Sequence, residues 1–187
     1  MNILVTGGAG YIGAHAVRQL LSAGHEVVVL DNLSTGLKSN LHKDAVLVKG
    51  DFGDLKVLRK LFGKYQSNLF DAVIHFAASI DLNESIQKPI EYFENNTLKT
   101  EVLVQEMLRT GIDKIIFSST AAVYGNQKIM PIPETAIGEN LAPYGESKLL
   151  SEQIIKAYSN STPLKAIVFR YFNACGSDFD KTIYPHH

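Results

Sequence analysis

Cysteine is scarce in this sequence, because Cys175 is the single one among 187 residues. One cysteine excludes an internal disulfide framework and is typical of a chain that works in a reducing compartment such as the cytosol. We expect Cys175 to be a small packing residue rather than a nucleophile.

Long apolar runs, a basic excess and low-complexity tracts are also missing. No apolar run approaches the roughly 20 residues that cross a bilayer, and the start at Asn2 lacks the charged and apolar regions of a signal peptide. The formal net charge is -1, which leaves no basic face for nucleic acid or an anionic membrane. The histidines His15, His25, His42 and His75 do not have the spacing that is typical of metal ligands. We therefore expect a cytoplasmic chain that binds no nucleic acid, membrane or metal.

Short apolar runs alternate with helical patterns in a chain long enough for one domain with a hydrophobic core. Strands are predicted over residues 3–5, 26–30, 45–48, 71–75, 115–118 and 166–170. Helices are predicted over residues 11–23, 54–63, 89–110 and 143–160. This alternation predicts an α/β fold, a Rossmann-type doubly wound parallel sheet with helices on both faces. We expect it to occupy residues 1–176, with a polar, loosely ordered tail over 177–187.

A glycine-rich stretch follows the first predicted strand and opens the first predicted helix. Gly7, Gly10 and Gly13 have the G-x-x-G-x-x-G spacing of loops that bind dinucleotides. The first glycine permits a tight turn, the second lets the backbone approach a pyrophosphate, and the third lets the helix pack closely on the sheet. The helix N-terminus then offers free N–H groups to the phosphates. Because ordinary turns also use glycine, the prediction depends on the strand before the loop and the helix after it.

Acidic residues follow the second and third predicted strands. At Asp31 a carboxylate can accept hydrogen bonds from ribose hydroxyls and repel a 2′-phosphate, which favours NAD over NADP. Asp31-Asn32 is also a common turn opener, but the glycine loop before it makes cofactor binding the preferred interpretation. Asp51 is expected to meet the adenine amino group in a similar way, on weaker grounds.

A Y-x-x-x-K pair, Tyr144 and Lys148, opens the last predicted helix after Pro143. On a helix the two side chains share one face, and an ammonium beside a phenol lowers the tyrosine pKa from its usual value of about 10. Such a tyrosine is a usable general base, and the lysine can also bond the nicotinamide ribose. The spacing alone fits a solvated helix face equally well. A second match, Tyr124 to Lys128, crosses a Gly-Asn turn signal, and we interpret it as chance.

Polar residues elsewhere support this pair. Ser118, Ser119 and Thr120 follow the fifth predicted strand, at the edge where open α/β sheets bind ligands. A hydroxyl there can relay a proton to the tyrosine, although loops also use small polar residues for no such purpose. Asn95 and Asn96 interrupt a good helix at a cost of roughly 0.6 kcal/mol each relative to alanine. A tertiary hydrogen bond, to a cofactor or to nearby backbone, would explain them.

Together these motifs resemble the extended short-chain dehydrogenases/reductases, and among them the UDP-glucose 4-epimerases. The matching stretches follow one another along nearly the whole chain: Leu4–Gly13, Asp31–Leu33, His75–Ala78, Glu84–Pro89, Asn95–Thr97, Phe117–Gly125, Pro143–Lys148 and Arg170–Asn173. The resemblance implies an NAD-dependent epimerase of a nucleotide sugar, which interconverts UDP-glucose and UDP-galactose by transient oxidation at C4.

The resemblance also implies roles for individual residues. Tyr144 would take the proton of the sugar 4-hydroxyl with help from Thr120, while Lys148 would tune Tyr144 and orient the cofactor. Contact with the UDP-sugar is expected from Thr120, Tyr144 and Asn173. Contact with NAD is expected from Gly7, Gly10, Tyr11, Ile12, Gly13, Asp31, Asn32, Asp51, Phe52, Phe76, Ala77, Asn95, Ser118, Tyr144, Lys148 and Tyr171. Family members commonly dimerise through helices that match 89–110 and 143–160, which implies a homodimer.

Several positions separate this sequence from its relatives. Ala121 and Ala122 stand where similar dehydratases carry Asp-Glu, whose acid expels water from the sugar, and where decarboxylases carry Ser-Glu, so no group is present there for that acid chemistry. Ser79–Asp81 replaces a loop that often holds a lysine near the cofactor phosphates, and one cofactor contact is expected to be missing. The family's second half, which encloses the UDP-sugar, is not found in this sequence. A catalytically silent NAD-binding fragment, or another extended short-chain dehydrogenase acting on a nucleotide sugar, is therefore the alternative.

Overall fold

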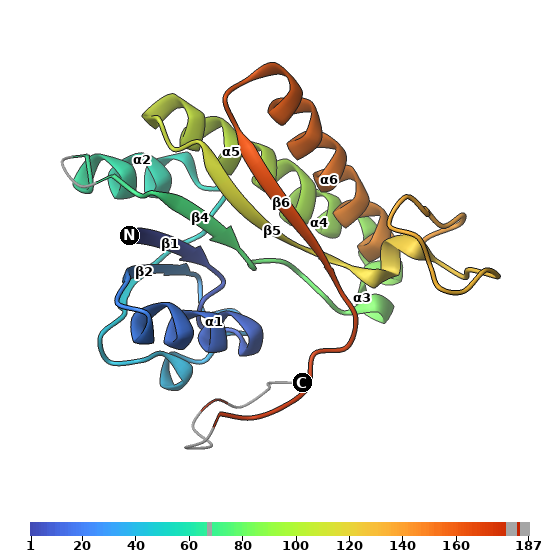
Figure 1. Cartoon of the computed structure of the whole chain (residues 1–187), viewed down its shortest axis with the longest axis horizontal. Coiled ribbons are helices and arrows are strands. Elements are labelled where there is room, and N and C mark those ends of the chain that lie inside the picture. The colour runs from blue at the N-terminus through green and yellow to red at the C-terminus, as the bar shows by residue number, and fades with distance from the viewer. Residues whose placement is uncertain (67–68, 179–182, 184–187) are drawn as a thin grey trace.

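Six parallel strands form one sheet in the computed structural model of the chain, which describes residues 1–66, 69–178 and 183 (Figure 1). The strands are β1 (Asn2–Thr6), β2 (Glu26–Asp31), β3 (Val46–Lys49), β4 (Ala72–His75), β5 (Lys114–Thr120) and β6 (Lys165–Tyr171). Their order in the sheet is β3-β2-β1-β4-β5-β6. The helices are α1 (Tyr11–Ser22), α2 (Leu55–Lys64), α3 (Leu82–Gln87), α4 (Pro89–Tyr92), α5 (Lys99–Thr110) and α6 (Pro143–Ser161). The predicted Rossmann-type parallel sheet is confirmed.

Alternating side chains of the strands build one core on each face of the sheet. Ile3 and Val5 of β1 belong to a cluster with Val17 of α1. Leu4, between them, belongs to a second cluster with Leu58 of α2 and with apolar residues of α5 and α6. Successive strand residues point to opposite faces, so a strand that is apolar throughout is buried on both. Figure 1 shows the result, with α1 on one side and α2, α5 and α6 on the other.

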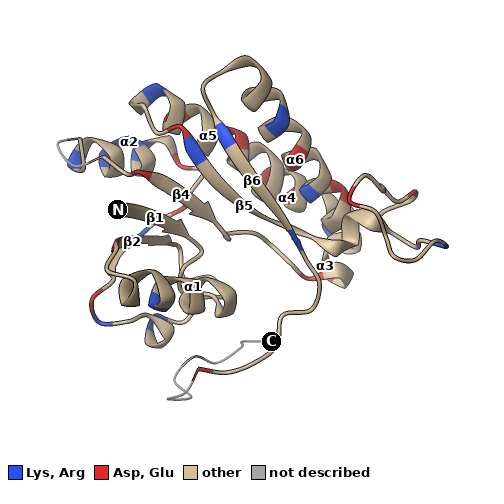
Figure 2. Ribbon diagram, in the orientation of Figure 1, with Lys and Arg blue, Asp and Glu red and all other residues tan. Residues whose placement is uncertain are grey.

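Charged residues lie mainly on the helices and the strand ends. Figure 2 shows Lys and Arg interspersed with Asp and Glu over the helices. The central strands β1 and β4 consist of NILVT and AVIH, which carry no Asp, Glu, Lys or Arg. These two strands therefore place no Asp, Glu, Lys or Arg in the middle of the sheet.

The predicted and observed elements differ most clearly around residues 82–110. Helix 89–110 is divided into α4, a π-helical segment η2 (Phe93–Leu98) and α5. Helix α3 was not predicted, although Asp81 caps it by accepting a hydrogen bond from the Glu84 N–H at 2.8 Å. An Asp followed three residues later by Glu is a recognised helix start, so this signal was present in the sequence.

The strand order reverses between β1 and β4, and in open α/β sheets ligands bind outside the carboxyl ends at such a point. The glycine loop leaves β1 here, and Phe76-Ala77 leaves β4. The N–H groups of Phe76 and Ala77 both donate to the Thr6 carbonyl, at 2.9 and 3.2 Å. Two loops that are far apart in sequence are thus held side by side at this edge.

Beyond β6 the chain returns to α1. The Tyr11 hydroxyl donates to the Gly176 carbonyl, and Arg18 forms an ion pair with Asp178 at 2.8 Å. The loose order expected of residues 177–187 falls mostly outside the described residues. The described part of that stretch is thus in contact with α1.

The packing role expected of Cys175 is wrong. Its thiol is exposed, because it follows β6 in an irregular stretch that neither a strand nor a helix holds against a core. Over residues 1–66, 69–178 and 183, no helix combines the length and hydropathy needed to cross a membrane. In the same ranges, no three or more His, Cys, Asp or Glu side chains gather as a metal site.

Candidate functional site

The glycine loop is held by two contacts that only glycine permits. Gly7 has a φ of 71°, which glycine adopts readily, and a Cβ there would lie 2.5 Å from the Ala77 nitrogen. A Cβ on Gly13 would lie 2.2 Å from the Gly7 carbonyl oxygen. The tight turn expected at Gly7 is confirmed. The close packing expected at Gly13 is against the loop itself, whereas the sequence suggested the sheet.

Helix α1 begins with its N–H groups open to a ligand. Its N-cap is Gly10, and within the described chain no side chain caps this end and no acidic residue lies in the first turn. A Cβ on Gly10 would have one neighbour within 4 Å, the Gly7 oxygen at 3.4 Å. The first N–H groups of a helix lack internal partners and carry partial positive charge. The start of α1, with Tyr11 and Ile12 as its first residues, therefore suits an anionic diphosphate.

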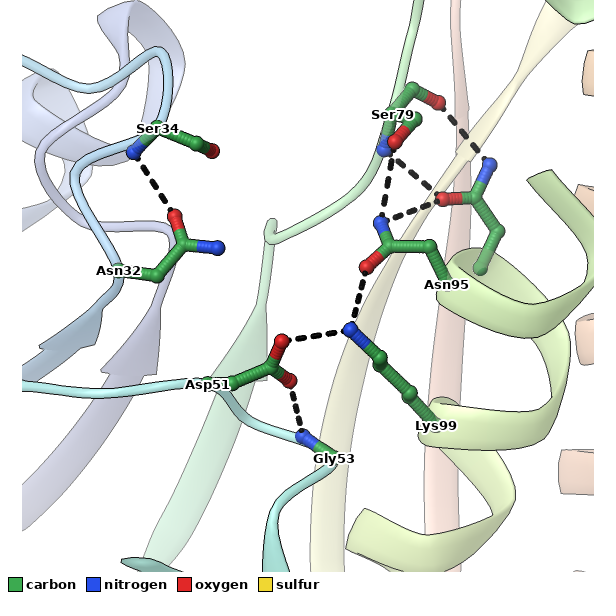
Figure 3. A network of polar contacts seen from close by, with 8 residues as sticks. Asn32, Ser34, Asp51, Gly53, Ser79, Asn95 and Lys99 are labelled. Carbon is green, nitrogen blue, oxygen red and sulfur yellow. Dashed lines mark hydrogen bonds and ion pairs between the residues drawn. The ribbon is translucent and has the colours of Figure 1, made fainter. Parts of the chain in front are cut away.

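Asp31 joins the glycine loop to the loop after β2. Its side chain is buried, one carboxylate oxygen accepts the Ala9 N–H at 2.9 Å, and the other accepts the Leu33 N–H at 2.8 Å. Asn32 is exposed beside it and accepts the Ser34 N–H at 2.9 Å (Figure 3). Asp31 thus lies at the carboxyl edge and also organises a turn, so the two interpretations are compatible. Since each carboxylate oxygen has two lone pairs, Asp31 can still accept bonds from ribose hydroxyls.

Tyr144 and Lys148 lie on the first turns of α6, beside the carboxyl end of β5. The Tyr144 and Thr120 side chains share a hydrogen bond, and Thr120 Oγ1 also accepts the Ala122 N–H at 3.1 Å. Lys148 is 2% exposed, and its ammonium lies 4.3 Å from the centroid of the Phe117 ring. The structure therefore brings the three residues predicted to be catalytic to the end of one strand.

Burial controls the pKa values of this cluster. Burial raises the pKa of Tyr144, and the hydrogen bond with Thr120 partly offsets that rise. Burial lowers the pKa of Lys148 to about 7, while the nearby Glu152 carboxylate favours the charged form. The expected lowering of the Tyr144 pKa by Lys148 is therefore wrong. The ammonium lies in a desolvated place that disfavours its own charge, and Thr120 is the group that favours the phenolate.

Asp51, expected at the adenine, lies in an ion pair that the sequence analysis missed. Its Oδ2 lies 2.5 Å from Nζ of Lys99 on α5, and its Oδ1 accepts the Gly53 N–H at 2.8 Å. The Lys99 ammonium also donates to Asn95 Oδ1 at 3.1 Å, as Figure 3 shows. Asn95 and Lys99 are four residues apart on one helical stretch, which was the available signal.

The π-helical segment η2 turns its asparagines toward the loop after β4. Asn96 Oδ1 accepts the Ser79 N–H at 2.8 Å, and its Nδ2 donates to the Ser79 carbonyl at 2.9 Å and to Ser147 Oγ at 3.1 Å. Asn95 Nδ2 donates to Ser79 Oγ at 3.2 Å. A hydrogen bond to nearby backbone, one of the two explanations expected, is confirmed for Asn96. It ties the β4 loop to α6, the helix that carries Tyr144.

Comparison with known proteins identifies the family of this chain. Residues 3–187 match the NAD dependent epimerase/dehydratase family. The chain belongs to this family. It is 45% identical over 186 residues to the UDP-glucose 4-epimerase of Haemophilus influenzae and 44% identical over 187 residues to that of Lacticaseibacillus casei. These matches cover 95% and 100% of the chain but 54% and 56% of the relatives, so the chain spans about half the length of the curated relatives that it matches.

Solved structures of the epimerase/dehydratase family have the same fold. The UDP-glucose 4-epimerase of Brucella ovis in complex with NAD has a TM-score of 0.93 at 39% identity, over 100% of this chain and 56% of that one. The Bifidobacterium longum enzyme in complex with NAD+ and UDP has a TM-score of 0.92 at 35% identity, over 100% and 57%. The fold of this chain therefore corresponds to somewhat more than half of each matched protein chain.

The residues after Thr120 and those in the loop after β4 have clear structural roles. Ala121 and Ala122 lie in a 3-10 turn, η3 (Ala121–Tyr124), directly after Thr120. In the loop after β4, Ser79 bonds the two asparagines and Asp81 caps α3. The second Y-x-x-x-K match has no helix through it, since η3 ends at Tyr124 and Gly125 has a φ of 55°.

A bidentate ion pair below the reacting residues was also missed. Arg170 of β6 donates to both carboxylate oxygens of Glu152, at 2.7 and 3.0 Å, and Ser119 donates to the same carboxylate. The Arg170 guanidinium lies 4.8 Å from the centroid of the Tyr124 ring. These contacts join β5, β6 and α6. Glu152 lies one helical turn after Lys148, and that spacing was the only local sign of this pair.

The other expected contact residues vary in accessibility. The Phe52 ring is buried, with its centroid 4.8 Å from that of His75, and its contact with NAD stays a prediction. Ser118 is half-buried in β5, and burial raises the pKa of Tyr171 at the end of β6. Asn173 is exposed just beyond β6.

Proposed function

We propose that this chain is the NAD-binding and catalytic part of a UDP-glucose 4-epimerase, which interconverts UDP-glucose and UDP-galactose. The names of the relatives support this substrate pair. One observation carries the proposal: Tyr144, Thr120 and Lys148 meet at the carboxyl end of β5, on the sheet edge that also holds the glycine loop and Asp31. Residues 1–176 form the proposed NAD-binding unit.

Three features of this edge fit NAD. The open N–H groups in the first turn of α1 suit the diphosphate, and the Asp31 carboxylate suits an adenosine ribose with a free 2′-hydroxyl. The buried Lys148 ammonium has, among described residues, a ring contact with Phe117 but no hydrogen-bond acceptor, so it can donate to the nicotinamide ribose. NAD held at this edge would supply a reversible hydride acceptor for C4 of the sugar.

The residues of the chain move the proton. Tyr144 accepts the proton of the 4-hydroxyl as C4 is oxidised, through its hydrogen bond with Thr120. The keto sugar then rotates so that its other face meets the hydride donor. Return of the hydride to that face, and of the proton from Tyr144 to the oxygen, inverts the configuration at C4. Because Ala121 and Ala122 offer no acid beside Thr120, a leaving group on the sugar is not protonated. This supports epimerisation over dehydration, and Asn173 is proposed to contact the UDP-sugar.

Conversion of UDP-galactose tests the proposal. The chain, supplied with NAD, is incubated with UDP-galactose and the appearance of UDP-glucose is followed by NMR, with Tyr144→Phe as the control. Conversion that the control lacks would establish the activity. Bound NAD without conversion would favour the alternative, a catalytically silent fragment. This alternative is a specific candidate because the chain covers only about half the length of each relative.

Asp31→Arg is expected to weaken NAD binding by about ten- to a hundred-fold, because hydrogen bonds to charged groups contribute roughly 1.5–3 kcal/mol. It should also reduce the preference for NAD over NADP, since arginine attracts a 2′-phosphate. Calorimetric titration with both dinucleotides measures this. Asp44→Arg, the same charge change at a side chain that is 63% exposed, is the control. An unchanged ratio of NAD to NADP affinity would refute the ribose assignment.

We also propose a homodimer formed through helices 89–110 and 143–160. Ile90 and Leu98 on the first of these are 71% and 55% exposed, and clustered exposed apolar residues mark interaction surfaces. The double variant Ile90→Lys, Leu98→Lys is expected to sediment as a monomer under conditions in which the wild type is dimeric. Ile129→Lys, in an exposed loop at 74%, is the matched control. Identical sedimentation of wild type and double variant would exclude this interface.

A cytoplasmic location is part of the same proposal. The exposed thiol of Cys175 supports it, because a reducing compartment keeps such a group from forming disulfides between chains.

A further inference from the structure

Lys99 places a positive charge at the sheet edge where the proposed cofactor is an anion. Its Nζ lies 2.5 Å from Asp51 Oδ2 and 3.1 Å from Asn95 Oδ1. An ammonium has three N–H groups, so one donor is left after these two contacts. The side chains of Lys99 and Asp51 are each 33% exposed, and the pair is therefore within reach of a ligand.

The stem of Lys99 is seated closely against the segment that carries Asp51. A Cβ on Gly53 would lie 2.2 Å from Cγ of Lys99, so the glycine provides the space that the stem fills. The Gly53 N–H holds one oxygen of Asp51 and Lys99 holds the other. Both oxygens keep a free lone pair. The Asp51 carboxylate is therefore fixed in orientation and can still accept a hydrogen bond.

Charge balance at this edge depends on Lys99. Asp31 ends β2 and Asp51 lies two residues beyond the neighbouring strand β3, and a nucleotide diphosphate adds negative charge beside them. Two like charges about 4 Å apart repel by about 1 kcal/mol in water and about 4 kcal/mol near a protein surface. Lys148 is buried against Phe117 and Arg170 is paired with Glu152, so neither of these two cations is paired with Asp51.

Asp51, Lys99 and Asn95 also lie where they could meet a nucleotide bound at Asp31. Figure 3 places Asn32 and Ser34 on one side and Asp51, Lys99 and Asn95 on the other, around the loop that leaves β4. Asn95 in turn bonds Ser79 of that loop, at 3.2 Å. A nucleotide held at Asp31 would therefore have Lys99 on its adenine side.

We propose that Lys99 is a positioning residue for the adenosine half of a nucleotide diphosphate: it neutralises Asp51, fixes that carboxylate for the adenine amino group, and offers its third N–H to the ligand. This inference rests on the proposed NAD binding. A purely structural ion pair at a partly exposed position would contribute only about 0–1 kcal/mol to stability and nothing to nucleotide affinity.

Lys99→Met keeps most of the stem and removes the charge, so it is the main test. Calorimetric titrations use three probes: NAD, ADP, and nicotinamide mononucleotide. We expect the affinities for NAD and for ADP to fall by a similar factor of about ten, while that for nicotinamide mononucleotide does not change. Lys114→Met is the control, because it removes a lysine that is paired with Asp113 at 3.1 Å at the amino end of β5.

Conservative variants keep the test decisive if Lys99→Met folds poorly. Lys99→Arg is expected to retain NAD affinity within about threefold, and Lys99→Gln to lose as much as Lys99→Met. Wild-type affinity for NAD and ADP in both Lys99→Gln and Lys99→Met would overturn the inference and leave the proposed function intact. Failure of the wild type to bind either nucleotide would instead refute the proposed function, and the inference with it.

Discussion

Gly13→Ala is expected to abolish measurable NAD binding and to lower the free energy of unfolding by several kcal/mol. The added Cβ would lie 2.2 Å from the Gly7 oxygen and 2.8 Å from the Gly8 Cα. Both are backbone atoms that cannot rotate away, and forcing extra volume into a packed site costs about 1–3 kcal/mol or more. Gly7 cannot yield either, because it lies against the Ala77 backbone with a φ of 71°. Urea denaturation and calorimetry measure the two effects.

Gly63→Ala is the matched control for this prediction. Gly63 is exposed on α2, and a Cβ there would meet no atom within 4 Å. Alanine is more favourable than glycine in a helix by roughly 0.5–1 kcal/mol, so this variant should be slightly more stable than the wild type and bind NAD normally. Wild-type stability and NAD affinity in Gly13→Ala would mean that the loop relaxes, and would contradict the account of its packing.

Lys148→Met is expected to stabilise the fold and to weaken NAD binding together. Burial lowers the pKa of Lys148 to about 7, whereas an unfolded lysine has a pKa of about 10.4. The wild type therefore gains stability as the pH rises from about 7 to about 10.4, because the unfolded chain then binds more protons. Methionine carries no such penalty, so its advantage is full below pH 7 and shrinks above it. We expect an advantage of roughly 1–3 kcal/mol at pH 6.5, the range for burying an unpaired polar group.

Urea denaturation at pH 6.5 and 9.5 checks this prediction, with Lys156→Met as the control on an exposed position of the same helix. The control should have the wild-type dependence of stability on pH and the wild-type affinity for NAD. Two results would contradict the claim that burial disfavours the charged form of Lys148. One is a Lys148→Met variant less stable than the wild type, and the other is a stability difference from the wild type that is the same at both pH values.

Features set by local sequence could be predicted. The strands follow from short apolar runs such as Ile3–Val5, and the dinucleotide loop from glycines between a strand and a helix. Parallel strands place their carboxyl ends at one edge, so the convergence of Thr120 and Tyr144 with the glycine loop could be expected from element order alone. The helix α3 could also have been found, from Asp81 and Glu84.

Contacts between distant segments, and the effects of burial, could not be predicted. Lys99 meets Asp51, and Arg170 meets Glu152, because helices cross particular strands at particular positions. The spacing of Tyr144 and Lys148 indicated a shared helix face but not that Lys148 would be buried over an aromatic ring. Burial therefore raises the Tyr144 pKa, and the hydrogen bond with Thr120 is what opposes that rise.

Titration of the amide-labelled chain with NAD, followed by backbone N–H resonances, tests the central claim most directly. We predict that the resonances of Gly7–Gly13, Asp31, Asp51 and Ser118–Thr120 shift together and saturate, because these residues border the carboxyl edge of the sheet. Asp113, at the opposite edge before β5, should not shift. No saturable shift in the glycine loop, or shifts confined to the amino edge, would contradict NAD binding at this site.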